Sequence, residues 1–114
     1  MSSSEVQRAR VCRAFCARAR LGDLWTDERP TAEAMALVER DGGPLSSGER
    51  LLLLLAWSIW SGDGPVSVGD ALASMDGVSL AMLGKLMTAA AQGSSAVDAW
   101  LTEHENGKRS VGHA

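Results

Sequence analysis

Two cysteines are the first residues in this chain whose side chains could take part in chemistry. Cys12 and Cys16 are four residues apart, a spacing that puts both on one side of a helix. A disulfide within one helix fits that spacing poorly, and two thiols with no nearby histidine or further cysteine are too few for a zinc site. We therefore expect no metal, and we interpret both cysteines as reduced, small core residues, which implies a reducing compartment.

The histidines and paired acids give little sign of catalysis. His104 ends an apolar helical stripe and His113 falls in a polar tail, so neither suggests a Ser–His–acid or Cys–His arrangement. The acid pairs at 27–28 and 103–105 lie at a connector and a helix end, where solvated charges are expected. The sequence therefore predicts a protein that is not an enzyme and uses no cofactor.

The segment LSSGER, residues 45–50, resembles the signature segment of ABC-type ATPases, because it leads into an apolar helix. That signature works only beside a phosphate loop of the form GxxxxGK[ST], and the one Gly-Lys pair, at 84–85, lacks both the correctly spaced glycine and the following Ser or Thr. Ser46 and Glu49 are three residues apart directly before the apolar run, which is the pattern of a capping box. We therefore predict that this segment starts a helix and binds no nucleotide.

A second segment, GDALASMDGVSLAMLGKL within residues 69–87, resembles a helix-turn-helix DNA-binding motif in its spacing. In that interpretation Ser79 and Lys85 would contact nucleic acid. However, positions 80–82, which should read bases, have no hydrogen-bonding side chains. Lys85 is also the only cation in the motif, whereas phosphate contacts need several. A DNA-binding regulator is therefore the alternative function.

Composition favours an all-α fold. The chain has 114 residues, of which 46% are hydrophobic and 22% charged, so it is long enough for one domain with its own core. It has no tyrosine and one phenylalanine, and alanine and leucine outnumber the β-formers. We expect a compact bundle of five to six short helices around a central apolar helix at about 46–61, with one domain over 1–106 and a disordered tail at 107–114.

Helix-starting and helix-breaking residues set the expected elements. The residues with the character of N-caps are Ser2, Thr31, Ser46, Ser67 and Ser95. Glycines or prolines follow each predicted helix, and Gly22 is expected to end the first. Periodicity then gives the buried faces, with Trp25 returning to the core from its connector. The other side chains expected to face inward are Cys12, Phe15, Cys16, Ala19, Met35, Val38, Val68, Ala71, Leu72, Met75, Leu80, Leu83, Met87, Val97, Trp100 and Leu101.

Several helices have more apolar surface than one face needs. The central helix is apolar on nearly every side, and the helix at 78–91 has a second apolar edge. Tryptophan and methionine are enriched at protein contacts, and exposed apolar patches are uncommon on monomers. We therefore expect a homodimer or a complex with another protein, with Trp57 or Trp60 meeting Met82 or Leu86. The alternative is that Trp57 and Trp60 belong to the core.

Charge is distributed unevenly along the chain. Residues 1–20 have five arginines and one acid, a net +4, whereas residues 21–107 have four basic and thirteen acidic side chains, a net −9. Arg10, Arg13 and Arg20 fall opposite the cysteine stripe, so they could contact a partner with an acidic surface. The alternative is that the basic helix simply attracts the acidic remainder of the same chain.

These observations together predict a small, non-catalytic protein–protein interaction module: a subunit, adaptor or inhibitor of a larger assembly. No membrane span is expected, since the apolar run at 51–60 has half the length that a span of about 20 residues needs. We expect a cytoplasmic protein, although the Arg- and Ser-rich start also resembles a mitochondrial transit peptide.

Overall fold

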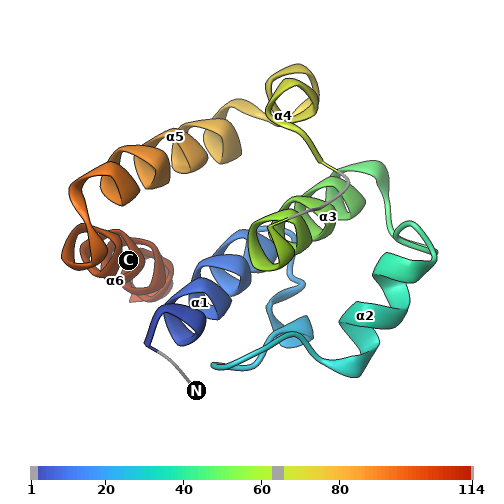
Figure 1. Ribbon diagram of the computed structural model, residues 1–114, viewed down its shortest axis with the longest axis horizontal. Helices are drawn as coiled ribbons and strands as arrows, with labels where there is room; N and C mark the ends of the chain where they lie inside the picture. The colour runs from blue at the N-terminus through green and yellow to red at the C-terminus, as the bar shows by residue number, and fades with distance from the viewer. Residues whose placement is uncertain (1–2, 63–65, 114) are drawn as a thin grey trace. The chain divides into compact units, whose positions relative to one another are not determined.

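The computed structural model describes residues 3–62 and 66–113, and these form six α-helices and one short 3-10 helix (Figure 1). The elements are α1 (Ser3–Ala17), η1 (Gly22–Leu24), α2 (Ala32–Glu39), α3 (Ser47–Ser61), α4 (Val68–Ser74), α5 (Gly77–Gln92) and α6 (Ser94–His113). Within the described residues there is no strand, only an isolated antiparallel bridge between Trp25 and Pro30. The predicted all-α class with five to six helices is therefore confirmed. No described helix is both long and apolar enough to cross a membrane.

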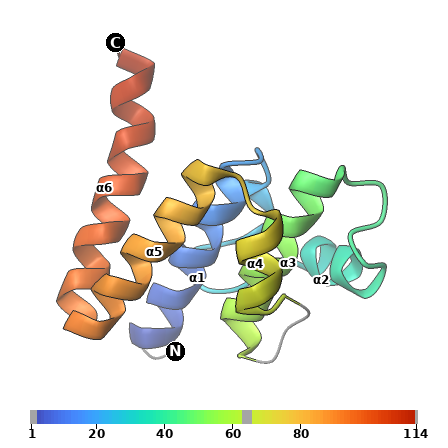
Figure 2. The same ribbon diagram turned by 90° about the horizontal axis from the view of Figure 1, so that it is seen from above.

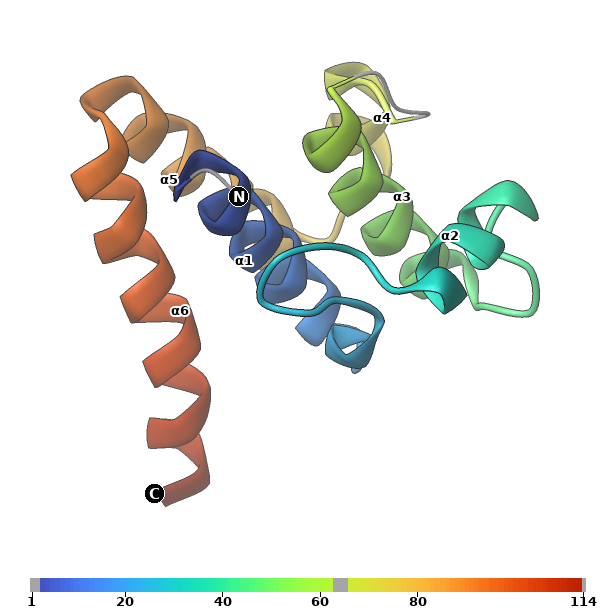
Figure 3. The ribbon, with the colours of Figure 1, turned by 60° about the horizontal axis from the view of Figure 1, so that its bottom comes forward.

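The helices group into two compact units, unit 1 up to Asp76 and unit 2 from Gly77 onward. In unit 1, α1 and α3 lie side by side and run in opposite directions, and α2 lies beside the start of α3 (Figures 1 and 3). Because α3 contributes Leu53 and Ala56 to the buried cluster that α1, η1 and α2 also line, it is the central helix that the sequence predicts.

Local capping fixes where three of these helices begin. Thr31 accepts a hydrogen bond from the Ala34 N–H at the start of α2. Ser46 and Glu49 form a complete capping box at α3, with the backbone N–H of each residue donating to the side chain of the other. Ser67 forms the same motif at α4. The interpretation of LSSGER as a helix start is therefore confirmed, whereas Ser2, the expected cap of α1, lies outside the described residues.

Replacing Ser46 with alanine should lower the free energy of unfolding by about 1 kcal/mol, because one N–H at the start of α3 loses its acceptor. Ser47 is the matched control: it is also exposed, lies one residue further on and is not the cap. Urea unfolding of both alanine variants checks this. Equal losses would show that the hydroxyl of Ser46 has no capping role.

The turn between α2 and α3 has three successive residues with positive φ: Asp41 at 53°, Gly42 at 91° and Gly43 at 53°. Gly42 is required there for a second reason. A Cβ atom on it would lie 2.4 Å from Cγ of Arg50, whose guanidinium pairs with Asp41 at 2.9 Å. The prediction that glycines follow the end of α2 is thus confirmed. The predicted end of the first helix at Gly22 is wrong, since α1 ends at Ala17 and Arg20 takes the left-handed conformation, with φ 63°.

The rotation of three helices differs from the periodicity prediction. Met35 is 44% exposed, Leu72 64% and Met87 57%, although each was expected to face inward. The buried residue of α2 is instead Ala34, whereas in α4 the burial of Ala71 agrees with the prediction. In α5 the buried face consists of Ser79, Met82, Leu86 and Ala89. Because these helices have apolar residues on several sides, spacing alone does not determine which side becomes buried.

Unit 2 is a helical hairpin in which α5 and α6 are joined at Gly93, whose φ is 118° (Figure 2). Val97, Trp100 and Leu101 of α6 are buried, as the sequence predicts. The indole N–H of Trp100 donates to the Met82 carbonyl at 3.2 Å, which ties the two helices together. Helical backbone continues to His113, beyond the domain boundary predicted at residue 106.

Candidate interaction surface

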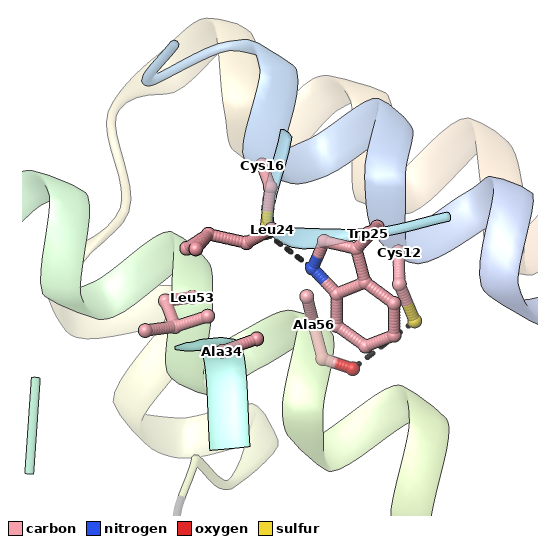
Figure 4. Close-up of a cluster of buried hydrophobic side chains, with 7 residues drawn as sticks. All are labelled: Cys12, Cys16, Leu24, Trp25, Ala34, Leu53 and Ala56. Atoms are coloured by element: carbon pink, nitrogen blue, oxygen red, sulfur yellow. Dashed lines mark hydrogen bonds between the residues drawn. The ribbon is translucent and has the colours of Figure 1, made fainter. Parts of the chain in front are cut away.

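A sulfur and tryptophan cluster lies beneath the surface of unit 1 (Figure 4). The Trp25 indole N–H donates to Sγ of Cys16 at 3.1 Å, and the Cys12 thiol donates to the Ala56 carbonyl, also at 3.1 Å. Both cysteines are buried and not joined in a disulfide. These contacts bind α1 to α3 and to the residue that follows η1.

Burial keeps both thiols in the neutral form. It raises the pKa of Cys16 to about 12, against the opposing effect of the hydrogen bond from Trp25. The pKa of Cys12 is also raised, first by burial and then by the neighbouring Cys16. Since a thiol must ionise to act as a nucleophile or metal ligand, the cluster is suited to packing rather than to chemistry. Within the described residues, no group of three His, Cys, Asp or Glu could hold a metal ion.

Arg8 joins the two antiparallel helices one turn beyond the Cys12–Ala56 contact. Its Nη1 donates to the Trp60 carbonyl at 2.8 Å, and its guanidinium carbon lies 5.5 Å from the Trp60 ring centroid. That carbonyl belongs to the last turn of α3, where backbone oxygens lack partners within the helix and a cation is favourable. Arg8 therefore caps α3 from another element and forms a cation–π contact at the same time.

Trp57 and Trp60 are both half-buried on α3. Their spacing of three residues puts them on the same side of the helix, and both pack against the buried cluster. Trp60 meets Trp25 edge to face, with ring centroids 5.9 Å apart and an interplanar angle of 70°. We call Arg8, Trp57 and Trp60 the tryptophan surface. Core packing anchors each of its indoles on one side and leaves part of each indole in contact with solvent.

One arginine of the predicted basic face, Arg13, is engaged within unit 1, as is the neighbouring Arg18. Arg13 forms an ion pair with Asp27, and Arg18 forms one with Asp76 at 3.5 Å. Arg10 is half-buried, and Arg20 is exposed just beyond the helix end. These pairs favour the alternative in which the basic helix attracts the acidic remainder of the same chain.

Arg8 was not among the site residues predicted from the sequence, although it contacts one of them, Trp60. A signal was present, because Arg8 precedes Cys12 by four residues and so lies on the cysteine side of α1. Its partner, Trp60, is 52 residues away in the sequence, so periodicity could not identify the contact.

The predicted site residues of unit 2 are placed differently. Met82 and Leu86, expected at a partner seam, are buried side chains of the hairpin helix α5. Ser79, expected to contact nucleic acid in the alternative function, is buried as well. Lys85 is exposed and pairs with Glu103 of α6 at 3.9 Å. The three residues of the tryptophan surface all belong to unit 1.

The sequence matches no protein-family model, and comparisons with curated proteins and with solved structures find no similar chain.

Proposed function

We propose that this chain is a small, non-catalytic protein–protein interaction module that binds its partner through the tryptophan surface. The observation that carries the proposal is the pair of half-buried indoles on α3, one of them beneath the Arg8 guanidinium. Tryptophan and arginine are the side chains most enriched among residues that dominate binding energy at interfaces.

The anchoring of these side chains favours binding. Trp60 is already fixed by the Trp25 ring and by Arg8, so little side-chain freedom remains to be lost when a partner covers it. The partner is either a second copy of the chain or another protein. The protected, unpaired thiols suit a reducing compartment such as the cytoplasm.

Replacing Trp57 with glutamine should weaken partner binding about 30-fold, the effect expected of an interface residue that contributes about 2 kcal/mol. Met35→Gln is the matched control, because Met35 is an exposed apolar side chain elsewhere in unit 1. Tagged wild-type and variant chains would be used to capture partners from a lysate, and the affinity for each captured protein would then be measured with purified components. Sedimentation equilibrium of the chain alone would detect self-association.

The proposal requires a partner whose binding Trp57→Gln weakens and Met35→Gln does not. Thermal unfolding of both variants by circular dichroism separates lost binding from lost folding. If the chain is monomeric and every captured protein binds Trp57→Gln as well as it binds the wild type, the tryptophan surface is not an interface.

A further inference from the structure

The four tryptophans fall into two classes by the state of their indole N–H groups. Trp25 and Trp100 are buried and donate to Sγ of Cys16 and to the Met82 carbonyl. Trp57 and Trp60 are half-buried, and among the described residues neither indole N–H has a hydrogen-bond acceptor. Two directional donors therefore remain available on the tryptophan surface.

Arg8 adds unused donors and a positive charge to the same surface. A guanidinium has five N–H groups, and the contacts of Arg8 within the described residues are the Trp60 carbonyl and the Trp60 ring. Arg13 and Arg18, in contrast, already face the carboxylates of Asp27 and Asp76. Arg8 is therefore held in a fixed position beside an aromatic ring. Among the described residues it has no carboxylate partner.

This combination of groups specifies the chemistry of a partner. Indole N–H groups are donors only, and a guanidinium prefers the two oxygens of a carboxylate or phosphate. The neighbouring indole faces favour an apolar side chain. A nucleic acid fits less well, because phosphate binding needs several cations together and the chain has a net charge of −3.

We propose that the tryptophan surface binds an acidic protein segment, in which a Glu or Asp carboxylate accepts hydrogen bonds from Arg8 and an indole while an adjacent apolar side chain covers the rings of Trp57 and Trp60. This inference depends on the proposed function, since it names the kind of partner for the same surface. Charge complementarity between Arg8 and the segment gives the specificity.

The test uses the full chain labelled with nitrogen-15 and a short synthetic peptide in which glutamates flank one leucine in a serine and glycine background. Indole N–H resonances, assigned with single Trp→Phe variants, report on each tryptophan separately. The signals of Trp57 and Trp60 should shift during titration, while those of Trp25 and Trp100, whose N–H groups are already bonded, should stay in place. Binding should weaken with added salt, because it involves exposed charges.

Arg8→Gln should weaken binding of this peptide roughly tenfold, the effect of losing one hydrogen bond to a charged group. Arg8→Lys retains the charge and should bind more tightly than Arg8→Gln. Arg50→Gln is the matched control, since Arg50 lies at the other end of α3 and pairs with Asp41. Thermal unfolding identifies any variant that fails to fold; if Arg8→Gln does, Arg8→Lys compared with wild type at rising salt serves in its place.

Two outcomes would overturn the inference. One is equal binding of a peptide with lysines in place of the glutamates; the other is preferential binding of a single-stranded DNA oligonucleotide. The proposed function is judged separately. If captured proteins depend on Trp57 but bind Arg8→Gln as tightly as wild type, the interaction surface stands and only its acidic partner chemistry is wrong.

Discussion

Replacing Leu53 with alanine should lower the free energy of unfolding of the chain by about 3 kcal/mol. Leu53 has no exposed surface and is the central leucine of the cluster that α1, η1, α2 and α3 line together. Its truncation removes buried contacts and leaves a cavity that the helices can only partly close. Urea unfolding followed by circular dichroism and tryptophan fluorescence measures the loss.

Leu72 provides the matched control for this prediction. It is also a helical leucine of unit 1, but its side chain is 64% exposed, so Leu72→Ala should change the free energy of unfolding by no more than about 0.5 kcal/mol. Leucine and alanine have similar helix propensities, so the difference between the two variants reports on burial. Losses of similar size would contradict the assignment of Leu53 to the core and Leu72 to the surface.

The chain should lose stability steeply above pH 9. Burial raises the pKa of both Cys12 and Cys16 in the folded chain, that of Cys16 to about 12. In the unfolded chain the same thiols have ordinary pKa values and ionise from about pH 8.5 upward. The unfolded state therefore binds fewer protons than the folded state at high pH, and the free energy of unfolding falls as pH rises.

Each thiol should reduce the free energy of unfolding by about 2 kcal/mol between pH 8 and pH 10.5. The chain has no tyrosine, so the usual phenol titrations do not obscure this range. Urea unfolding under a reducing agent across this pH range would measure the slope. A variant with both Cys12→Ala and Cys16→Ala is less stable at neutral pH but should show a much flatter dependence; an unchanged slope would exclude the thiols as its cause.

The sequence predicted best those features that depend on neighbours in the chain. The Ser46–Glu49 capping box, the Thr31 cap and the Gly42 turn each involve atoms within a few residues, so residue type and spacing are enough to specify them. Arg20 shows the limit of this approach, since a non-glycine residue took the left-handed position that ends α1.

The rotation of the helices and the composition of the surface were harder to predict, because both depend on distant partners. Met87 and Leu72 looked like core residues by spacing, yet both are exposed. In α5 it is Leu86, predicted at a partner seam, that is buried. Trp57 and Trp60 could be identified as surface candidates by their size and number. The contact between Arg8 and Trp60 could not be predicted, because it exists only after α1 and α3 have packed.

The separation of α1 from α3 in the chain has a consequence during synthesis. Cys12 and Arg8 contact Ala56 and Trp60, which lie 44 and 52 residues later in the sequence. At ordinary translation rates these partners are made roughly 2 to 10 s after the residues of α1 that they contact. Until α3 is made, the contacts of Cys12 and Arg8 with it cannot form, so we expect the thiols of the nascent α1 to react as exposed cysteines do. We therefore expect the protection of Cys12 by α3 to begin only after α3 has emerged from the ribosome.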